Sequence, residues 1–117
     1  MVLRFANGAL GEVHVDYVQR SYSRTCQIIG EEGTIRWDYA AGEVRWYSAA
    51  TQDWQVFANP LGWDPNKMYL DEMRHFLMCL AGQDRPVLDV FEAARVLEVA
   101  LAAKRSADSG KVLELGG

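Results

Sequence analysis

The chain has 117 residues, 50% of them hydrophobic, and a formal net charge of −4. This length suits one cooperative domain, expected to span 1–117. The slightly acidic balance excludes the basic surface that nucleic acids or anionic membranes require. No apolar run reaches the length of a bilayer span, no leader pattern precedes the first strand, and Cys26 and Cys79 lack Cys-x-x-Cys spacing. These features favour a soluble protein of the reducing cytoplasm.

Apolar and polar residues alternate with the period of β-strands through the first half of the chain. The alternating apolar sets are Val13, Val15 and Tyr17, then Ile35, Trp37 and Tyr39, then Val44 and Trp46. Turn signals separate them at Asn7-Gly8, Gly30-Glu31-Glu32-Gly33, Ala41-Gly42 and Thr51-Gln52. Residues 1–58 therefore predict an antiparallel meander of about six strands.

The first turn sets which side chains share a face of the sheet. A two-residue turn at Asn7-Gly8 pairs Phe5 with Leu10 on one face and Val2 with Val13 on the other, unless a bulge near Gly11 shifts the register. A sheet with helices on one side normally exposes a polar second face to water. An apolar second face would need a partner to cover it.

The period becomes helical after residue 62. Asp64-Pro65 predicts a helix start, and the apolar stripe Tyr69, Met73, Phe76, Leu77 and Leu80 precedes a stop at Gly82. A second helix is expected over 89–108, with a capping box of Asp89 and Glu92 and a buried stripe of Val90, Ala94, Leu97 and Leu101. Residues 112–115 predict a closing edge strand. The fold class is α+β: a mostly antiparallel open sheet of about six strands plus a C-terminal strand, with two helices on one face.

Motifs for catalysis, coenzymes and metals are not found in the sequence. The glycines form no Gly-x-Gly-x-x-Gly or Walker-type loop, and no serine lies in a Gly-x-Ser-x-Gly elbow. The single Glu72-x-x-His75 pair is interpreted as a solvent-side ion or capping interaction rather than a metal site. His14 is interpreted as a polar-face or interface histidine, and both cysteines as core residues. We expect no catalytic, cofactor-binding or metal-binding residue in this chain.

The segment Gln19–Thr25 has more charged and aromatic character than a plain turn requires. It contains Arg20, Tyr22 and Arg24, which together could bind a carboxylate or a polyol. An edge loop with solvated arginines explains the same residues, and both readings stay open. The four tryptophans are interpreted as core and interface residues rather than as a platform for bases.

Four segments, taken together, have a familiar order. They are Leu3-Arg4-Phe5-Ala6-Asn7-Gly8-Ala9-Leu10-Gly11, Cys26-Gln27-Ile28-Ile29-Gly30-Glu31-Glu32-Gly33-Thr34-Ile35, Tyr69-x-x-Glu72-x-x-x-Phe76, and Ala100-x-x-Ala103-Lys104-Arg105-Ser106-Ala107-x-x-Gly110-Lys111-Val112. The combination resembles the C-terminal substrate and oligomerisation domain of the Gfo/Idh/MocA oxidoreductases, over nearly the whole chain.

The resemblance implies an NAD(P)-dependent parent oxidoreductase that acts on a sugar-like or polyol substrate. An N-terminal Rossmann domain, absent from this chain, would bind NAD(P) and supply the catalytic residues, so this chain alone would be inactive and bind no cofactor. The open sheet would form a homo-oligomer. Tyr22, Arg24 and Tyr69 would bind the small-molecule substrate, and the two arginines around Tyr22 depart from the inositol-type pattern and leave room for an anionic sugar.

Two alternatives stay open. The chain could be a free-standing dimeric ligand-binding or interaction module without catalysis, or a small cofactor-free enzyme that uses His14 or His75. Coenzyme binding by the chain would contradict the reading as a substrate domain. Loss of an activity on replacing either histidine would favour the small enzyme.

Overall fold

The computed structural model describes residues 1–116 and is an α+β structure with antiparallel sheets. Its elements in chain order are β1 (Val2–Arg4), β2 (Leu10–Glu12), β3 (Thr25–Gly30), β4 (Gly33–Asp38), β5 (Glu43–Ser48), β6 (Asp53–Ala58), α1 (Pro65–Leu80) and α2 (Val90–Ser109). The chain divides into two compact units, Asp16–Lys67 and the remainder, Met1–Val15 with Met68–Gly117. Each unit is described by itself.

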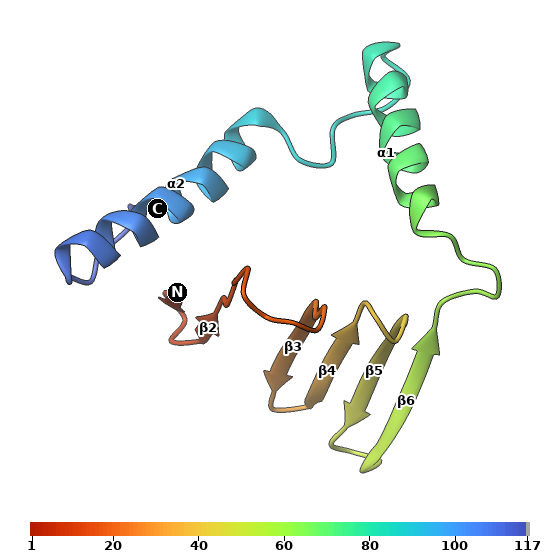
Figure 1. The fold of residues 1–117 in the computed structure, drawn as a ribbon, viewed down its shortest axis with the longest axis horizontal. Helices are drawn as coiled ribbons and strands as arrows, with labels where there is room; N and C mark the ends of the chain where they lie inside the picture. The colour runs from red at the N-terminus through yellow and green to blue at the C-terminus, as the bar shows by residue number, and fades with distance from the viewer. Residues whose placement is uncertain (117) are drawn as a thin grey trace. The chain divides into compact units, whose positions relative to one another are not determined.

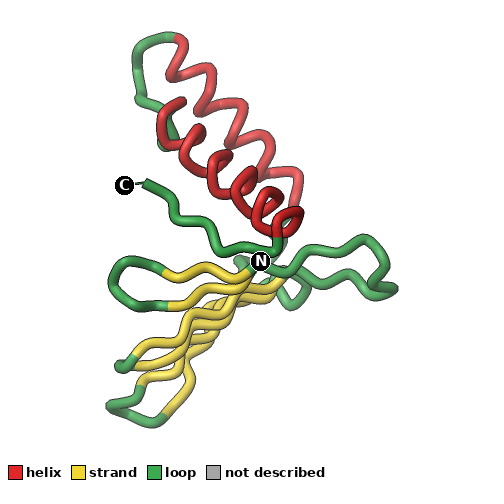
Figure 2. Tube along the Cα trace, turned by 90° about the vertical axis from the view of Figure 1, so that its left-hand side faces the viewer, coloured by secondary structure: helices red, strands yellow, loops and turns green. Residues whose placement is uncertain are grey.

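The unit Asp16–Lys67 contains a four-stranded antiparallel sheet in the order β3-β4-β5-β6 (Figure 1). Short loops join consecutive strands, as the yellow and green segments of Figure 2 show. The β3–β4 turn holds only Glu31 and Glu32, because Gly30 pairs directly with Gly33. The predicted meander is therefore present for these four strands, whereas β1 and β2 form a separate two-stranded sheet rather than continuing it.

The register of the four strands sorts their side chains onto two faces, since directly opposed residues share a face. One face, here called the apolar face, carries the apolar residues Cys26, Ile28, Ile35, Trp37, Val44, Trp46 and Phe57, together with Ser48, Asp53 and Gln55 towards the β5–β6 turn. The opposite face, here called the mixed face, carries Thr25, Gln27, Ile29, Thr34, Arg36, Asp38, Glu43, Arg45, Tyr47, Trp54 and Val56. The alternation seen in the sequence thus places Ile35 and Trp37 with Val44 and Trp46, as expected.

The β1–β2 hairpin has a different register from the one expected. Arg4 pairs with Leu10 and Val2 with Glu12, whereas a two-residue turn would pair Phe5 with Leu10. The turn contains an additional residue: the Gly8 amide donates to the Phe5 carbonyl at 2.9 Å, and Gly8 has φ 87°. This is a three-residue loop with a left-handed glycine, and it shifts every pair by one residue.

Two predicted strands are not formed as expected. The strand expected through Tyr17 ends at Glu12. Beyond it, Asp16 Oδ1 accepts the amides of Val18 and Gln19 at 3.0 and 2.7 Å and forms a local turn instead. The closing strand expected at 112–115 is an irregular segment without a strand partner among the described residues.

Both helices start and end close to the predicted residues. Asp64 Oδ1 accepts the amide of Asn66 at 3.0 Å at the start of α1. In α2, Asp89 accepts the amides of Phe91 and Glu92, and the Glu92 side chain accepts the Asp89 amide, which confirms the capping box. The predicted ends are therefore fixed by local hydrogen bonds.

The burial predicted for the α2 stripe of Val90, Ala94, Leu97 and Leu101 is wrong, and the apolar stripe of α1 is exposed as well. On α1, Tyr69, Met73, Phe76, Leu77 and Leu80 are all exposed, and on α2 the side chains of Val90, Leu97 and Leu101 are exposed while Ala102 is buried. The cysteines are not core residues either, since Cys26 is exposed and Cys79 half-buried. Neither described helix has the length and apolar character needed to cross a membrane.

Candidate functional site

Arg24 lies against two aromatic rings of the sheet. It precedes β3, its carbonyl accepts the Tyr39 amide at 3.0 Å, and this bond extends the β3–β4 ladder by one pair. Its guanidinium carbon is 5.5 Å from the ring centroid of Trp37 and 5.5 Å from that of Tyr39. Both distances are within the range of a cation–π interaction, which holds the arginine at one end of the apolar face.

Tyr22 and Trp63 complete an aromatic cluster around Tyr39. The ring centroids of Tyr22 and Trp63 lie 5.9 and 6.2 Å from that of Tyr39. The Trp37 centroid lies 6.2 Å from the Tyr39 centroid, and all three contacts are edge to face. Tyr22 is 67% exposed and Trp63 is 36% exposed. We call Tyr22, Trp37, Tyr39 and Trp63 the aromatic cluster.

This arrangement has the chemistry of an anion-binding position. A cation–π contact leaves the guanidinium N–H groups able to donate, and a planar guanidinium matches a carboxylate in a two-bond geometry. Arg45 and Arg74 each form an ion pair with a carboxylate elsewhere in the described residues, Glu43 and Asp71. The Tyr22 hydroxyl adds a further donor or acceptor on the same cluster.

The structure brings together two of the three residues predicted to bind substrate. Tyr22 and Arg24 both contact Tyr39, as described above. Tyr69 lies on α1 in the other compact unit, where its ring is 62% exposed. Its grouping with Tyr22 and Arg24 therefore stays a prediction.

A shallow hollow of about 380 Å³ lies elsewhere on the sheet. It is lined by Thr25, Cys26, Gln27, Arg36, Trp37, Asp38, Glu43 and Arg45, most of them from the mixed face. The positive charges of Arg36 and Arg45 are balanced there by the carboxylates of Asp38 and Glu43. Arg45 Nε lies 3.6 Å from Glu43 Oε1. Arg36 and Arg45 also lie over the Trp54 ring, at 5.3 and 5.7 Å. Neither Tyr22 nor Arg24 lines this hollow.

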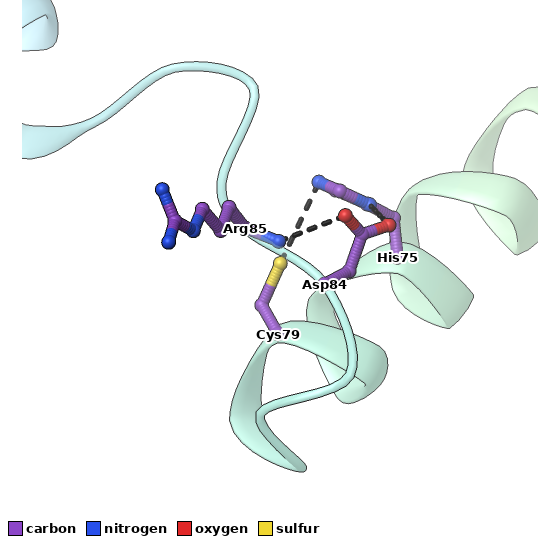
Figure 3. Close-up of polar contacts among 4 residues, drawn as sticks. All are labelled: His75, Cys79, Asp84 and Arg85. Carbon is purple, nitrogen blue, oxygen red and sulfur yellow. Dashed lines mark hydrogen bonds and ion pairs between the residues drawn. The ribbon is translucent and has the colours of Figure 1, made fainter.

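A third group of polar side chains lies at the C-terminal end of α1 (Figure 3). His75 Nδ1 is 3.2 Å from Asp84 Oδ2, and His75 Nε2 is 3.6 Å from Cys79 Sγ. The polar partner of His75 here is therefore Asp84, whereas the ion or capping interaction expected for the Glu72-x-x-His75 pair stays a prediction. Because Asp84 and Cys79 contact opposite nitrogens of one imidazole, they do not converge on a point, and no metal-binding group of three is found among residues 1–116.

Sequence reasoning missed several members of these groups although signals for them were present. A two-residue Glu31-Glu32 turn pairs Arg24 with Tyr39 and Cys26 with Trp37, so the register alone would have placed Arg24 beside both rings. His75 and Cys79 are four residues apart, the spacing of neighbours on a helix face. Trp63 gave no such signal, because it joins the cluster from the irregular segment before α1.

Comparison with known proteins gives one match. Searches of curated proteins and of solved structures returned no match. A family model, described as the C-terminal alpha/beta domain of an oxidoreductase family, GFO_IDH_MocA_C, matches residues 1–115. The match covers nearly the whole chain and agrees with the α+β architecture, the antiparallel sheet and the two helices. The chain therefore belongs to the Gfo/Idh/MocA oxidoreductase family, as its C-terminal domain.

Proposed function

We propose that this domain binds the substrate of an NAD(P)-dependent oxidoreductase and assembles the enzyme into a homo-oligomer, while an N-terminal Rossmann domain of the parent enzyme holds the coenzyme. The observation that carries the substrate role is the fixed position of Arg24 over Trp37 and Tyr39. The family match supports membership in a two-domain oxidoreductase. The substrate is a sugar-like or polyol molecule, and Arg24 favours one that bears a carboxylate.

The topology supports placing the coenzyme on another domain. Dinucleotide sites of the Rossmann type need parallel strands joined by a helix, with a glycine-rich turn at the helix start. The described strands pair only antiparallel, and the sequence has no such glycine pattern. The chain alone should therefore be inactive, and calorimetric titration with NADH and NADPH should give no binding heat. Micromolar binding of either coenzyme would contradict this proposal.

A pair of arginine variants tests the substrate site. The purified chain is titrated with D-glucuronate, and with D-glucose as the neutral comparison, while the tryptophan indole signals are followed by NMR. Removing a charge-assisted hydrogen bond of about 1.5–3 kcal/mol weakens binding by roughly ten- to a hundredfold. Arg24→Gln should lose glucuronate binding by about that factor. Arg95→Gln is the control, since Arg95 is an exposed arginine of α2 in the other compact unit.

The outcomes separate the proposed site from a merely structural arginine. Glucuronate binding that Arg24→Gln leaves unchanged would show that Arg24 only packs on the aromatic cluster. Equal binding of glucose and glucuronate would remove the preference for an anionic substrate. Absence of binding by either sugar would contradict a substrate pocket in this domain.

The two faces of the sheet suggest different roles in assembly. Most side chains of the apolar face on β3, β4 and β5 are of the types found in protein interiors. The mixed face combines Trp54, Tyr47, Arg36 and Arg45, and aromatic residues with arginine are enriched at protein–protein interfaces. A two-fold contact would set the arginines of one copy against the Asp38 or Glu43 carboxylates of the other. We therefore place the oligomer interface on the mixed face.

Ile28 and Ile29 provide a matched test because neighbouring strand residues point to opposite faces. Their side chains are 59% and 75% exposed. Ile29→Lys should shift the chain towards monomer in sedimentation velocity with little change in unfolding free energy. Ile28→Lys should lower the unfolding free energy instead. An unchanged oligomer in Ile29→Lys, or a wild-type chain that is monomeric at all concentrations, would refute the interface.

A further inference from the structure

Cys79 and His75 form a thiol–imidazole pair on α1. The four-residue spacing places both side chains on one face of the helix, and Cys79 Sγ lies 3.6 Å from His75 Nε2 (Figure 3). The thiolate is the reactive form of cysteine, and a neighbouring imidazole that accepts the thiol proton increases its population. The pair therefore has the first requirement of a nucleophilic thiol.

Asp84 orients the imidazole for this role. Its carboxylate lies 3.2 Å from His75 Nδ1 and can only accept when ionised, so Nδ1 carries the proton and Nε2 presents a lone pair to Cys79. A carboxylate that holds a histidine in one tautomer is the positioning element of Ser-His-Asp and Cys-His-Asn triads. Asp84 is thus a positioning residue that acts on the thiol through His75.

The turn after α1 brings Asp84 back to the helix. The amide of Gln83 donates to the Met78 carbonyl at 2.9 Å and that of Gly82 to the Cys79 carbonyl at 3.0 Å, with Gly82 at φ 70°. This is the Schellman pattern of helix ends. The Asp84 carboxylate also accepts the Arg85 amide at 2.8 Å, so that the aspartate itself is held.

The group is open to a solvent-borne reagent. Cys79 is half-buried, and the side chains of His75 and Asp84 are 35% and 47% exposed. The thiol and the imidazole therefore lie in a partly shielded position that a small molecule can reach. None of them belongs to the aromatic cluster or to the hollow on the sheet.

We propose that Cys79 is a nucleophilic thiol that forms mixed disulfides with low-molecular-weight disulfides, with His75 as its base and Asp84 as the positioning residue. His75 Nε2 takes the thiol proton, and the Cys79 sulfur attacks one sulfur of the disulfide. The new S–S bond forms as the old one breaks, and the leaving thiolate departs with the electron pair and takes the proton from His75. Cys79 is oxidised and the leaving half of the reagent is reduced, so the domain carries a thiol-redox modification site.

Cys26 is an internal reference for ordinary thiol reactivity. It is the other cysteine of the chain and is exposed on β3, opposite Trp37. The unit Asp16–Lys67 that contains it has no histidine. The rate of Cys26 thus gives the reactivity of a thiol in the same protein without a histidine in its unit.

The test measures thiol–disulfide exchange of the full chain with excess 5,5′-dithiobis(2-nitrobenzoate), through the absorbance of the released thiolate. Cys26→Ser and Cys79→Ser variants isolate each rate. An ordinary thiol is only about 1% thiolate at about pH 6.5. With His75 as its base, Cys79 should react about tenfold faster than Cys26 at that pH. The ratio should fall towards one near about pH 9.5, where ordinary thiols are ionised.

Two variants in the Cys26→Ser background separate the roles. His75→Asn should bring the Cys79 rate and its pH profile to those of Cys26. Asp84→Asn should lower the rate by a smaller factor and shift the same profile, an effect that a purely structural aspartate would not have. Glutathione disulfide then replaces the reagent, and the mixed disulfide is expected on the Cys79 peptide by mass spectrometry.

The opposite results overturn the proposal. They are equal rates of Cys79 and Cys26 at about pH 6.5, an unchanged rate in His75→Asn with the helical circular dichroism intact, or glutathione on Cys26 alone. If His75→Asn loses helix, the pH profile of the unaltered Cys79 decides. A profile of the same shape as that of Cys26 refutes the role of His75, and a distinct one supports it.

Discussion

Gly33 lies at the start of β4 with its Cα against the backbone of β5. A Cβ added there would stand 2.0 Å from the Tyr47 carbonyl oxygen and 3.1 Å from its carbonyl carbon, at a φ of +157°. An ordinary carbon–oxygen contact is about 3.3 Å, so β4 and β5 would have to separate by roughly 1 Å. Such a shift weakens the flanking ladder bonds, each worth about 1 kcal/mol, and overpacking adds about 1–3 kcal/mol. Gly33→Ala should therefore lower the unfolding free energy by about 2–4 kcal/mol.

Gly30 is the matched control because it pairs with Gly33 across the same turn. A Cβ on Gly30 meets nothing nearer than the Gly33 carbonyl oxygen at 4.0 Å. Gly30→Ala should cost less than about 1 kcal/mol. Urea unfolding of the full chain, followed by tryptophan fluorescence, gives both values. Equal losses in the two variants would show that the sheet accommodates the added carbon, and the steric argument would be wrong.

Two further predictions concern helix ends. Asp89→Ala removes the capping box of α2 and should lower the unfolding free energy by about 1 kcal/mol. Asp89→Ser keeps a side-chain acceptor and should lower it little. Equal thermal unfolding of the two variants would contradict the role of the cap. Gly82→Ala and Gly62→Ala impose similar backbone strain, because the two glycines have φ of 70° and 77° and an added Cβ would meet no atom within 4 Å. Of the two, Gly82 is the one in the turn that brings Asp84 back to α1. The Cys79 exchange rate should fall in Gly82→Ala alone, and a fall in neither variant would separate the turn from the thiol.

The elements that could be predicted from the sequence are those that local chemistry determines. Asp64, Asp89 and Gly82 fix the helix ends through backbone hydrogen bonds within a few residues, and the predicted bounds were correct within one or two positions. The predicted alternation of Ile35 and Trp37 on β4 and of Val44 and Trp46 on β5 is correct for the same reason, because short turns set the register of consecutive strands.

The errors arose where a non-local partner or one additional turn residue decides the outcome. Asn7-Gly8 suggests a two-residue turn, but the observed loop includes a third residue, which shifts the register of β1 and β2. The strand expected at 112–115 has enough β-forming residues, yet a strand also needs a neighbour, and composition cannot supply one. Burial of the helix stripes is non-local in the same way, because it depends on what covers them.

The two candidate sites depend on different parts of the chain, and this offers a test of the predicted single domain over 1–117. The Arg24 site is built across β3 and β4 in one unit, whereas His75, Cys79 and Asp84 come from α1 and the turn after it in the other. A helix of 16 residues is marginal by itself, so the Cys79 exchange rate should report whether α1 is held by the rest of the domain. If Gly33→Ala, which acts on the sheet, also alters the Cys79 rate, the two units fold as one cooperative domain. If ligand binding at Arg24 is lost while the Cys79 rate is unchanged, the units are independent and the single-domain prediction fails.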